Sequence, residues 1–313
     1  MNKLMDRFLE NRVCTHMADN TYINYKLDLA QFDAYMTETV GHGDWVLFAT
    51  DEQVERYMTS LIQMTNEDGS KKYENTTINR KMTSVKSFFN YCVKQKIITE
   101  SPATAIETLI VHTKRKQILT IQEIRNIIDN SYNRVKGERS FRFVSARDRF
   151  IIALLTTTGL RKSELINVRL SNLDLLDNGC YMINISSKEV KNNLNKRVPI
   201  ANVTLQYFKE YMAQREKIKS IKDEDVLLLT VRGTKMSDDA VEKLIHKQLE
   251  KNNLEDREIT PHSFRHICTT YMRMNGENDS IIYKVLGWKE GIIDNYTNDS
   301  YLDEQKIRAC NLL

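Results

Sequence analysis

Residues that interrupt helices are scarce in this chain, which has three prolines and ten glycines among 313 residues. Between them, long stretches repeat apolar side chains at the helical period of about 3.6 residues. Together these features predict a largely helical protein. Two short runs rich in β-forming residues, 180–186 and 196–200, add strands of a hairpin. The predicted fold class is therefore mainly α with a small β-hairpin or sheet, α+β overall.

Long hydrophobic runs are missing as well. No apolar stretch approaches the ~18 residues that a membrane helix needs. The first ten residues mix acidic with apolar side chains, unlike a signal peptide. These features predict a soluble, cytoplasmic protein without a membrane partner.

Clustered metal ligands are also missing from the sequence. The five cysteines lie far apart without a C-x-x-C pair, so we expect reduced thiols rather than a zinc site or a disulfide framework. The acidic residues form no cluster like those of metal-dependent nucleases. We therefore expect neither a metal nor another cofactor.

Neither sign of charge dominates, because 46 lysines and arginines face 42 acidic residues, a formal net charge of +4. This mild excess permits a nucleic-acid partner without demonstrating one, so local clustering is the better guide. Three consecutive cations at 114–116 lie in a short polar segment. The chain length suits two domains. We expect a helical domain at 1–110, a linker at 111–117 and a second domain at 118–313.

A helix predicted over residues 75–94 has two distinct faces. One carries an apolar stripe, and the opposite face presents short or basic side chains: Arg80, Ser84, Ser87 and Lys94. Such a face suits a helix in a DNA major groove, where arginine reads guanine and serine contacts base or phosphate. A solvated helix face has the same composition. Periodicity alone leaves both interpretations open.

The second domain places cations where its predicted elements break. A strongly apolar helix ends at Gly159, and Arg161 opens the next helix with Glu164 one turn later. The loop between the two predicted strands carries Lys188 and Lys191. A lysine at a hairpin tip can reach a phosphodiester, and it can equally be a solvated turn residue.

Further along, an imidazole and a guanidinium lie one helical turn apart. They are His262 and Arg265 in the string T-P-H-S-F-R-H, followed by L-G-W at Trp288 and by Tyr296 eight residues later. Two guanidiniums, with Arg161 as the second, stabilise the charge that a phosphodiester transition state develops. A tyrosine activated by a base or a cationic field can attack phosphorus.

Taken in order, these strings resemble the tyrosine recombinase (phage integrase) family. The resemblance rests on T-G-L-R-K-S-E-L, a hairpin lysine, H-S-F-R-H, L-G-W and the tyrosine after it, and it covers the whole second domain. T-I-N-R-K-M-T-S-V-K-S-F-F-N-Y and other strings of the first domain are similar to the family's helical core-binding domain. Any one string is weak evidence, but five in order are specific. The first 20 residues are too few for an additional arm-binding domain, so the resemblance implies a simple Xer-like or mobile-element integrase.

The resemblance assigns a role to each residue of the pattern. It makes Arg161 the first catalytic arginine, His262 and Arg265 the H-x-x-R pair, and Tyr296 the nucleophile. Trp288 stands where most members have histidine, and its indole N–H can donate to a phosphate oxygen. The interval from this tryptophan to the tyrosine is one residue shorter than in the family.

Two assignments keep an alternative. Lys191, eight residues before Pro199 as in the family, is favoured over Lys188 as the general acid for the leaving 5′-oxygen. Tyr301 is the alternative nucleophile. Glu164 belongs to the family's pattern as a residue that helps to hold the site, and it is equally a helix-start acid that favours the dipole.

The activity that the resemblance implies is site-specific recombination of double-stranded DNA through a 3′-phosphotyrosyl link, with four protomers and a Holliday junction, without metal or ATP. It also implies that the C-terminal segment at 301–313 docks on a neighbouring protomer, although its apolar residues could pack within their own chain. A type IB topoisomerase shares the chemistry and reseals the same strand. A non-catalytic DNA-binding regulator could use the same scaffold.

Overall fold

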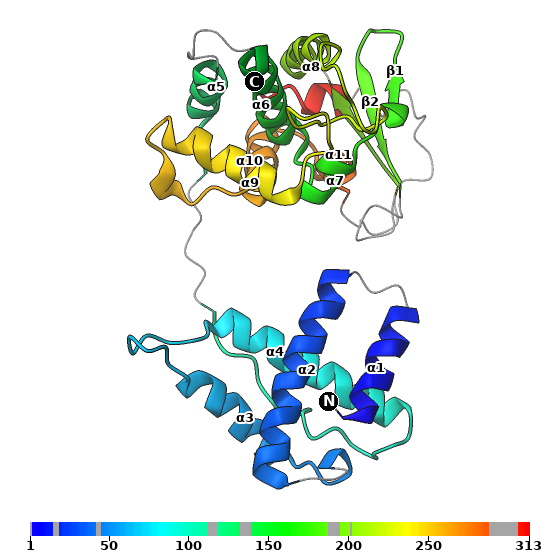
Figure 1. The fold of residues 1–313 in the computed structure, drawn as a ribbon, viewed down its shortest axis with the longest axis vertical. Coiled ribbons are helices and arrows are strands. Elements are labelled where there is room, and N and C mark those ends of the chain that lie inside the picture. Colours follow the sequence, from blue (N-terminus) through cyan, green and yellow to red (C-terminus); the bar gives the residue numbers. More distant parts are fainter. Residues whose placement is uncertain are drawn as a thin grey trace. The chain divides into compact units, whose positions relative to one another are not determined.

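The structure is a computed structural model that describes residues 2–14, 19–41, 45–111, 118–131, 139–186, 195–200, 202–287 and 306–313. The chain divides into two compact units, Met1–Lys114 and Arg115–Leu313 (Figure 1). Helices dominate both units, and the second also holds a small antiparallel sheet. The predicted α+β class is confirmed. Within the described ranges, no helix has the length and apolar character to cross a membrane.

In the first unit, helices pack around an aromatic core. The helices are α1 (Lys3–Cys14), α2 (Asp19–Val40), α3 (Asp51–Gln63) and α4 (Asn75–Lys94). Phe32 of α2 lies at the centre of this core, with its ring centroid 4.9 Å from that of Tyr57 and 6.0 Å from that of Phe89. Rings bury large apolar areas at such separations and favour tilted or edge-on contacts. The core therefore fixes α2 against α3 and α4.

The boundaries of α4 agree with the predicted helix at 75–94. Helix α1 adds to the predicted elements, because Met5, Phe8 and Leu9 are buried at helical spacing. The chain after α4 returns along that helix, where the Asn79 side chain bonds both the backbone N–H and the carbonyl oxygen of Leu109, each over 2.8 Å. This return holds the segment before the predicted linker to the first unit.

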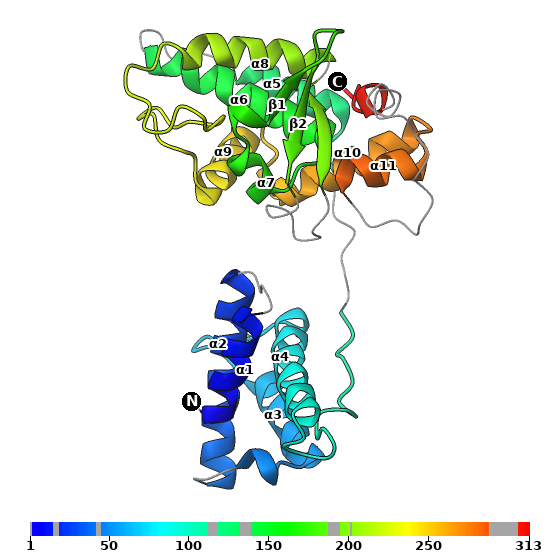
Figure 2. The same cartoon turned by 90° about the vertical axis from the view of Figure 1, so that its right-hand side faces the viewer.

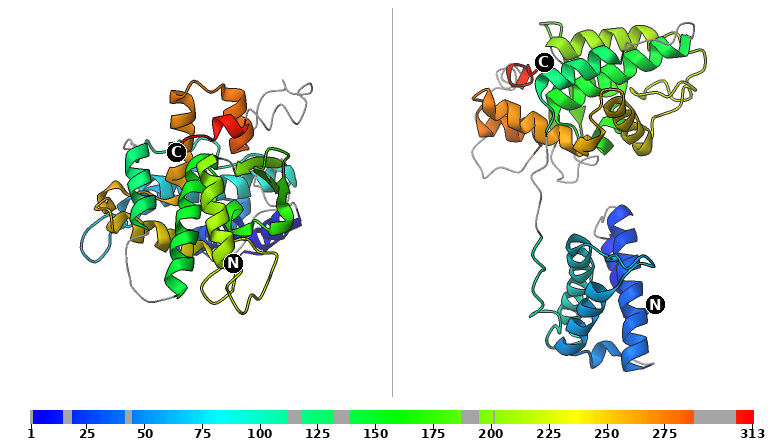
Figure 3. Two further views of the ribbon diagram at one scale, coloured as in Figure 1. Left: turned by 90° about the horizontal axis from the view of Figure 1, so that it is seen from above. Right: turned by 90° about the vertical axis from the view of Figure 1, so that its left-hand side faces the viewer.

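The second unit wraps helices around α6 and packs them against one sheet (Figure 2). Its helices and strands are α5 (Ile121–Asn130), α6 (Arg139–Thr158), α7 (Lys162–Asn167), β1 (Leu173–Leu175), β2 (Tyr181–Ile185), β3 (Lys196–Ile200), α8 (Asn202–Arg215), α9 (Asp238–Glu250), α10 (Pro261–Met274) and α11 (Asp279–Leu286). Thr120 and Glu123 cap α5 with a capping box, in which each side chain bonds the backbone N–H of the other residue. Helices α6 and α8 lie side by side, as Figures 1 and 3 show.

The sheet is antiparallel in the order β1-β2-β3. Ile183 pairs with Val198, and the next loop leaves the sheet after Ile185 and returns at its partner Lys196. Strands β2 and β3 match the two predicted runs, and β1 is a third strand that the sequence pattern does not reveal. Helix α6 ends at Thr158, directly before Gly159, where the sequence predicts the break.

The C-terminal residues 306–313 pack onto their own unit. Ala309, Cys310 and Leu312 are buried in a cluster with side chains of α10 and α11, including Cys268 and Ile282. Within this chain, Ala309, Cys310 and Leu312 are therefore buried against their own unit.

Candidate catalytic site

Arg161 stands at a sharp break between two helices. Helix α6 ends at Thr158, and Gly159 has a φ of +58°, a conformation that side chains with a Cβ rarely adopt. Arg161 is the N-cap of α7, and its side chain is 22% exposed. The glycine thus turns the chain so that a guanidinium sits at the mouth of the helix junction, as predicted.

Glu164 holds Arg161 in place from the first turn of α7. Its carboxylate accepts the backbone N–H of Arg161 over 2.9 Å and a guanidinium N–H of the same residue over 2.7 Å. The carboxylate is buried. Both bonds are charge-assisted or close to a helix N-terminus, where an acid is favoured. Glu164 therefore orients the candidate catalytic arginine through two direct hydrogen bonds.

Helix α10 presents His262 and Arg265 one turn apart near its N-terminus. Pro261 occupies the first helical turn, where its missing N–H costs nothing. His262 is exposed, and its ring packs edge-on against His266 with a centroid separation of 4.9 Å. Arg265 is buried, at 3% exposure. The two groups lie on one face of the helix, as their spacing predicts.

Arg265 connects α10 to the ends of two other helices. Its Nη1 donates to the carbonyl oxygen of Gly159 over 2.9 Å, and its Nη2 donates to the carbonyl oxygen of Leu286. The helix-end carbonyls of α6 and α11 have no acceptor role within their own helices, so a guanidinium is a suitable donor for both. Arg265 and Arg161 are thereby brought to the same corner of the unit.

Lys196 is a third cation in this corner, and the sequence pattern does not single it out. It is the first residue of β3, it is 2% exposed, and its ammonium group donates to Glu164 over 3.0 Å. The aliphatic part of the side chain lies close to Gly287, where an added Cβ would be 3.0 Å from the lysine Cδ. Alternation in β3 could have shown that this lysine faces inward, but most lysines at strand ends are solvated.

The charges at this corner perturb one another. Burial, reinforced by repulsion from Arg161, lowers the pKa of Arg265 to about 10. Burial lowers the pKa of Lys196 to about 8; Glu164 opposes this shift, and the two arginines add to it. Burial alone would raise the pKa of Glu164, but Lys196 and Arg161 outweigh it and hold that pKa below its usual range. Cations held together with one shared carboxylate form a site suited to an added anion.

Three residues of the predicted site lie outside the described residues: Lys191, Trp288 and Tyr296. The same holds for the alternatives Lys188 and Tyr301. One described residue beside each of the two gaps lies near the corner formed by the arginines. Lys196 follows the loop that holds both lysines, and Gly287 immediately precedes Trp288.

The predicted DNA-facing side of α4 is only partly accessible. Arg80 and Lys94 are exposed, and Ser87 is half-buried and hydrogen-bonded to Tyr25 over 3.1 Å. Ser84 has a different place from the predicted one: it is 1% exposed and donates to the buried carboxylate of Asp28 over 2.9 Å. Because α4 packs against α2 along this line, Ser84 serves the packing of the unit rather than an open surface.

Asp28 organises this part of α4. Its carboxylate also receives a guanidinium N–H of Arg80 and the ammonium group of Lys81, the latter over 3.2 Å. A buried carboxylate needs several donors to offset the loss of water. Asp28 thus fixes the position of the partly exposed Arg80 guanidinium. The sequence pattern of α2 does not indicate that Asp28 contacts α4.

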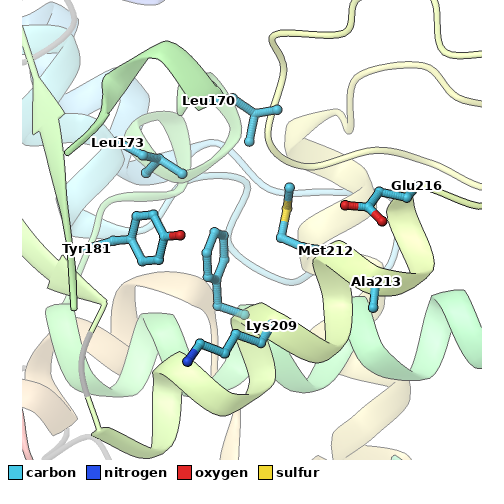
Figure 4. Close-up of a pocket in the computed structure, with 8 residues that line it drawn as sticks. Leu170, Leu173, Tyr181, Lys209, Met212, Ala213 and Glu216 are labelled. Carbon is cyan, nitrogen blue, oxygen red and sulfur yellow. The ribbon is translucent and has the colours of Figure 1, made fainter. Parts of the chain in front are cut away.

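A pocket of about 440 Å³ with a mixed polar and apolar lining lies elsewhere in the second unit, between the sheet and α8 (Figure 4). Its lining includes Leu173, Tyr181 and Met212, together with the charged side chains of Lys209 and Glu216 (Figure 4). None of the described site residues lines it. The pocket is separate from the cluster of cations.

The sequence of the chain matches known protein families over most of its length. The profile described as the phage integrase family matches residues 117–303, and that of the phage integrase N-terminal SAM-like domain matches residues 6–96. The chain is 26% identical over 279 residues to tyrosine recombinase XerD of Oceanobacillus iheyensis, covering 88% of this chain and 86% of that protein. It is 27% identical over 274 residues to tyrosine recombinase XerC of Halalkalibacterium halodurans, covering 86% and 82%.

Solved structures share the fold. XerH site-specific recombinase bound to difH substrate, a pre-cleavage complex, aligns with a TM-score of 0.66 at 16% identity, covering 97% of this chain and 90% of that one. A lambda integrase dimer bound to a COC′ core site aligns with a TM-score of 0.64 at 14% identity, covering 98% and 95%. The phage integrase profile alone spans more than half of the sequence. The chain therefore belongs to the phage integrase family of tyrosine recombinases.

Proposed function

We propose that this protein is a site-specific DNA recombinase that cuts and rejoins strands through a 3′-phosphotyrosyl link to Tyr296. The observation that supports this most is the gathering of Arg161, Arg265 and Lys196 around one carboxylate, Glu164. Among the described residues of this corner, three cations and one acid leave two positive charges in excess. A phosphodiester that passes through a pentacovalent transition state presents the matching negative charge.

In the proposed cleavage step, the phenolate oxygen of Tyr296 forms a bond to the scissile phosphorus, and the bond from phosphorus to the 5′-oxygen breaks. Arg161 and Arg265 bind the non-bridging oxygens, which carry the developing charge. His262 takes the phenol proton, and Trp288 donates its indole N–H to a phosphate oxygen. Lys191 gives a proton to the leaving 5′-oxygen.

Rejoining reverses these steps. A 5′-hydroxyl of a partner strand attacks the phosphotyrosyl phosphorus, and the tyrosine leaves with its proton restored. Each step exchanges one phosphate ester for another, so the bond energy is retained and the reaction needs neither ATP nor a metal ion. Exchange of two strand pairs in succession passes through a Holliday junction.

The proposed partners are double-stranded DNA with a specific recombination site and three further copies of the protein. Similar structures support this assembly, because one of them is a lambda integrase tetramer bound to a Holliday junction, with a TM-score of 0.61. In the first unit, we assign DNA contacts to Arg80, Ser87 and Lys94. Arg80 is partly exposed and paired with Asp28, and it is the base-reading candidate among them.

A nicked suicide duplex tests the proposal. Its sequence is first selected by the protein from a randomised duplex pool, and the nick lets the short 5′-hydroxyl fragment diffuse away, so that the covalent intermediate accumulates. The proposed function predicts a protein–DNA adduct that forms in EDTA without ATP. A sequence-independent relaxation of supercoiled plasmid would favour a topoisomerase instead. Specific duplex binding without adduct or relaxation would favour a non-catalytic regulator.

A further inference from the structure

Lys196 is a buried lysine at the junction of three chain segments. Its ammonium group contacts Glu164 in the first turn of α7 over 3.0 Å, and the exposures of the two side chains are 0% and 1%. Its backbone pairs with Ile185, at the start of the loop that carries Lys191. Its aliphatic carbons lie against Gly287, the C-cap of α11. One residue therefore contacts, through its side chain or its backbone, the segments that lead to three of the proposed catalytic groups.

A structural ion pair is the simpler interpretation, but it leaves the charge unexplained. Two apolar side chains of similar volume are often as stable as a buried ion pair, because desolvation of the charges offsets their attraction. The lowered pKa of Lys196, about 8, shows that burial penalises the ammonium form here. A buried ammonium group that is retained despite this desolvation penalty is consistent with a function for its positive charge.

The carboxylate of Glu164 divides its contacts between two cations. Glu164 has two oxygens: Oε1 binds the guanidinium of Arg161 over 2.7 Å, and Oε2 binds both the Arg161 backbone N–H and Lys196. With Lys196 protonated, the carboxylate is shared between two cations, and Arg161 keeps part of its charge for an outside anion. Without that proton, Glu164 neutralises Arg161 alone.

We propose that Lys196 is a positioning residue for strand cleavage, which acts through Glu164 to keep Arg161 oriented and electrostatically available to the scissile phosphate. This inference rests on the proposed recombinase function and assigns Lys196 no contact with DNA. The same contact ties the first residue of β3 to the first turn of α7.

Protonation of Lys196 then controls the rate on the alkaline side. Among the described residues, the charged groups that face the ammonium are Glu164, Arg161 and Arg265, and the thiols of Cys268 and Cys310, whose pKa values burial raises, also interact with it. As the pH rises through about 8, the lysine loses its proton and the rate of cleavage falls. The substrate for this measurement carries a 5′-bridging phosphorothiolate, whose sulfur leaves without protonation. The pH–rate profile then no longer depends on the group that protonates the leaving oxygen.

Single-turnover adduct formation on this phosphorothiolate suicide duplex tests the inference with four variants. Lys196→Met removes the charge and is expected to slow cleavage roughly thirtyfold. Lys196→Arg keeps a charge that does not titrate, so its rate should stay level above pH 8. Lys209→Met is the control, because it removes an exposed lysine from α8, on the side of the unit away from α7 (Figures 1 and 2).

The double variant Lys196→Met with Glu164→Gln separates charge from packing. The amide introduced by Glu164→Gln can still accept from Arg161 but no longer neutralises it, so the double variant should cleave about tenfold faster than Lys196→Met alone. A packing role predicts the opposite, since the second substitution removes another native contact. Circular dichroism checks that each variant is folded before its rate is compared.

The outcomes divide cleanly. A folded Lys196→Met protein that cleaves as fast as wild type overturns the inference, and so does a double variant no faster than the single one. If Lys196→Arg is too large for the site and unfolds, the comparison of single and double variants decides alone. If wild-type protein itself forms no adduct, the proposed recombinase function fails, which is a different result from an unchanged Lys196→Met rate.

Discussion

The guanidinium of Arg265 donates to the carbonyl oxygen of Gly159 over 2.9 Å, joining residues 106 positions apart in the chain. The acceptor lies two residues before Arg161, so the bond sets the relative placement of the two arginines. A second bond from Arg265 to Leu286 fixes the end of α11, just before the segment with Trp288 and Tyr296. One buried side chain thus gathers the described parts of the site.

Substitution of Gly159 by alanine should destabilise the second unit. The glycine has a φ of +58°, and an added Cβ would lie 2.6 Å from Leu286 Cδ2 and 3.3 Å from Cys268 Cβ. Strain at positive φ combined with this overlap is expected to lower the free energy of unfolding by about 2–4 kcal/mol. Urea denaturation measures the change.

Gly179→Ala is the matched control for that experiment. Its φ of +79° carries the same backbone strain, but a Cβ there would have no atom within 4 Å. We expect a loss of about 1 kcal/mol from conformation alone. Equal losses at the two glycines would show that the contact with Leu286 and Cys268 has no energetic weight.

Replacement of Arg265 by lysine should abolish most of the cleavage activity while keeping a positive charge. Lysine cannot donate to two separate carbonyls and also present a flat fork to phosphate. We expect adduct formation to slow by about 10²- to 10³-fold, the usual effect of losing one transition-state donor. Arg273→Lys is the control on the same helix, since that arginine is exposed and pairs with Asp279. Similar rates for both variants would contradict the role of Arg265.

The free energy of unfolding should respond to the Lys196 proton in a defined direction. The folded pKa of about 8 lies below the ordinary value of 10.5, so between these pH values the unfolded chain binds more protons. Stability from this group therefore rises with pH across that window, on the order of 3 kcal/mol. Denaturation series for wild type and Lys196→Met should diverge between pH 8 and 10.5, and parallel curves would contradict the assigned proton.

Arg80→Ala should weaken binding of the selected duplex. The guanidinium is 43% exposed and oriented by the buried Asp28, so little order is lost when it meets a base edge. Loss of a bidentate contact costs about 1–3 kcal/mol, or roughly 5- to 150-fold in affinity. Fluorescence anisotropy measures it, with Arg56→Ala on α3 as the control for an exposed arginine in an i,i+4 pair. Unchanged affinity in Arg80→Ala would remove α4 from the DNA interface.

The predicted helices and the arginine positions follow from local signals. Gly159 marks the break before Arg161, and one helical turn places His262 and Arg265 on one face; both features depend on backbone geometry that the sequence encodes nearby. The capping box at Thr120 is of the same kind. Helix boundaries and the spacing of residues within one helix could therefore be predicted, because neighbouring residues in the sequence determine them.

Long-range contacts were beyond such rules. Lys196 and Glu164 are 32 residues apart, and Asp28 and Ser84 are 56 apart. Whether a lysine or serine on a polar face is solvated or buried depends on which helix covers it, and periodicity carries no information about the partner. The same limit explains why the face of α4 was predicted as open at Ser84, where α2 covers it.

The identity of the DNA-linked residue decides whether Tyr296 is the nucleophile of this recombinase. The adduct formed on the nicked duplex is digested with nuclease and trypsin, and the peptide that retains a nucleotide is sequenced by mass spectrometry, with Tyr296→Phe and Tyr301→Phe proteins in parallel. We expect a nucleotide on Tyr296, no adduct from Tyr296→Phe and an adduct from Tyr301→Phe. A nucleotide on Tyr301, or an adduct that persists in Tyr296→Phe, would contradict the proposed chemistry.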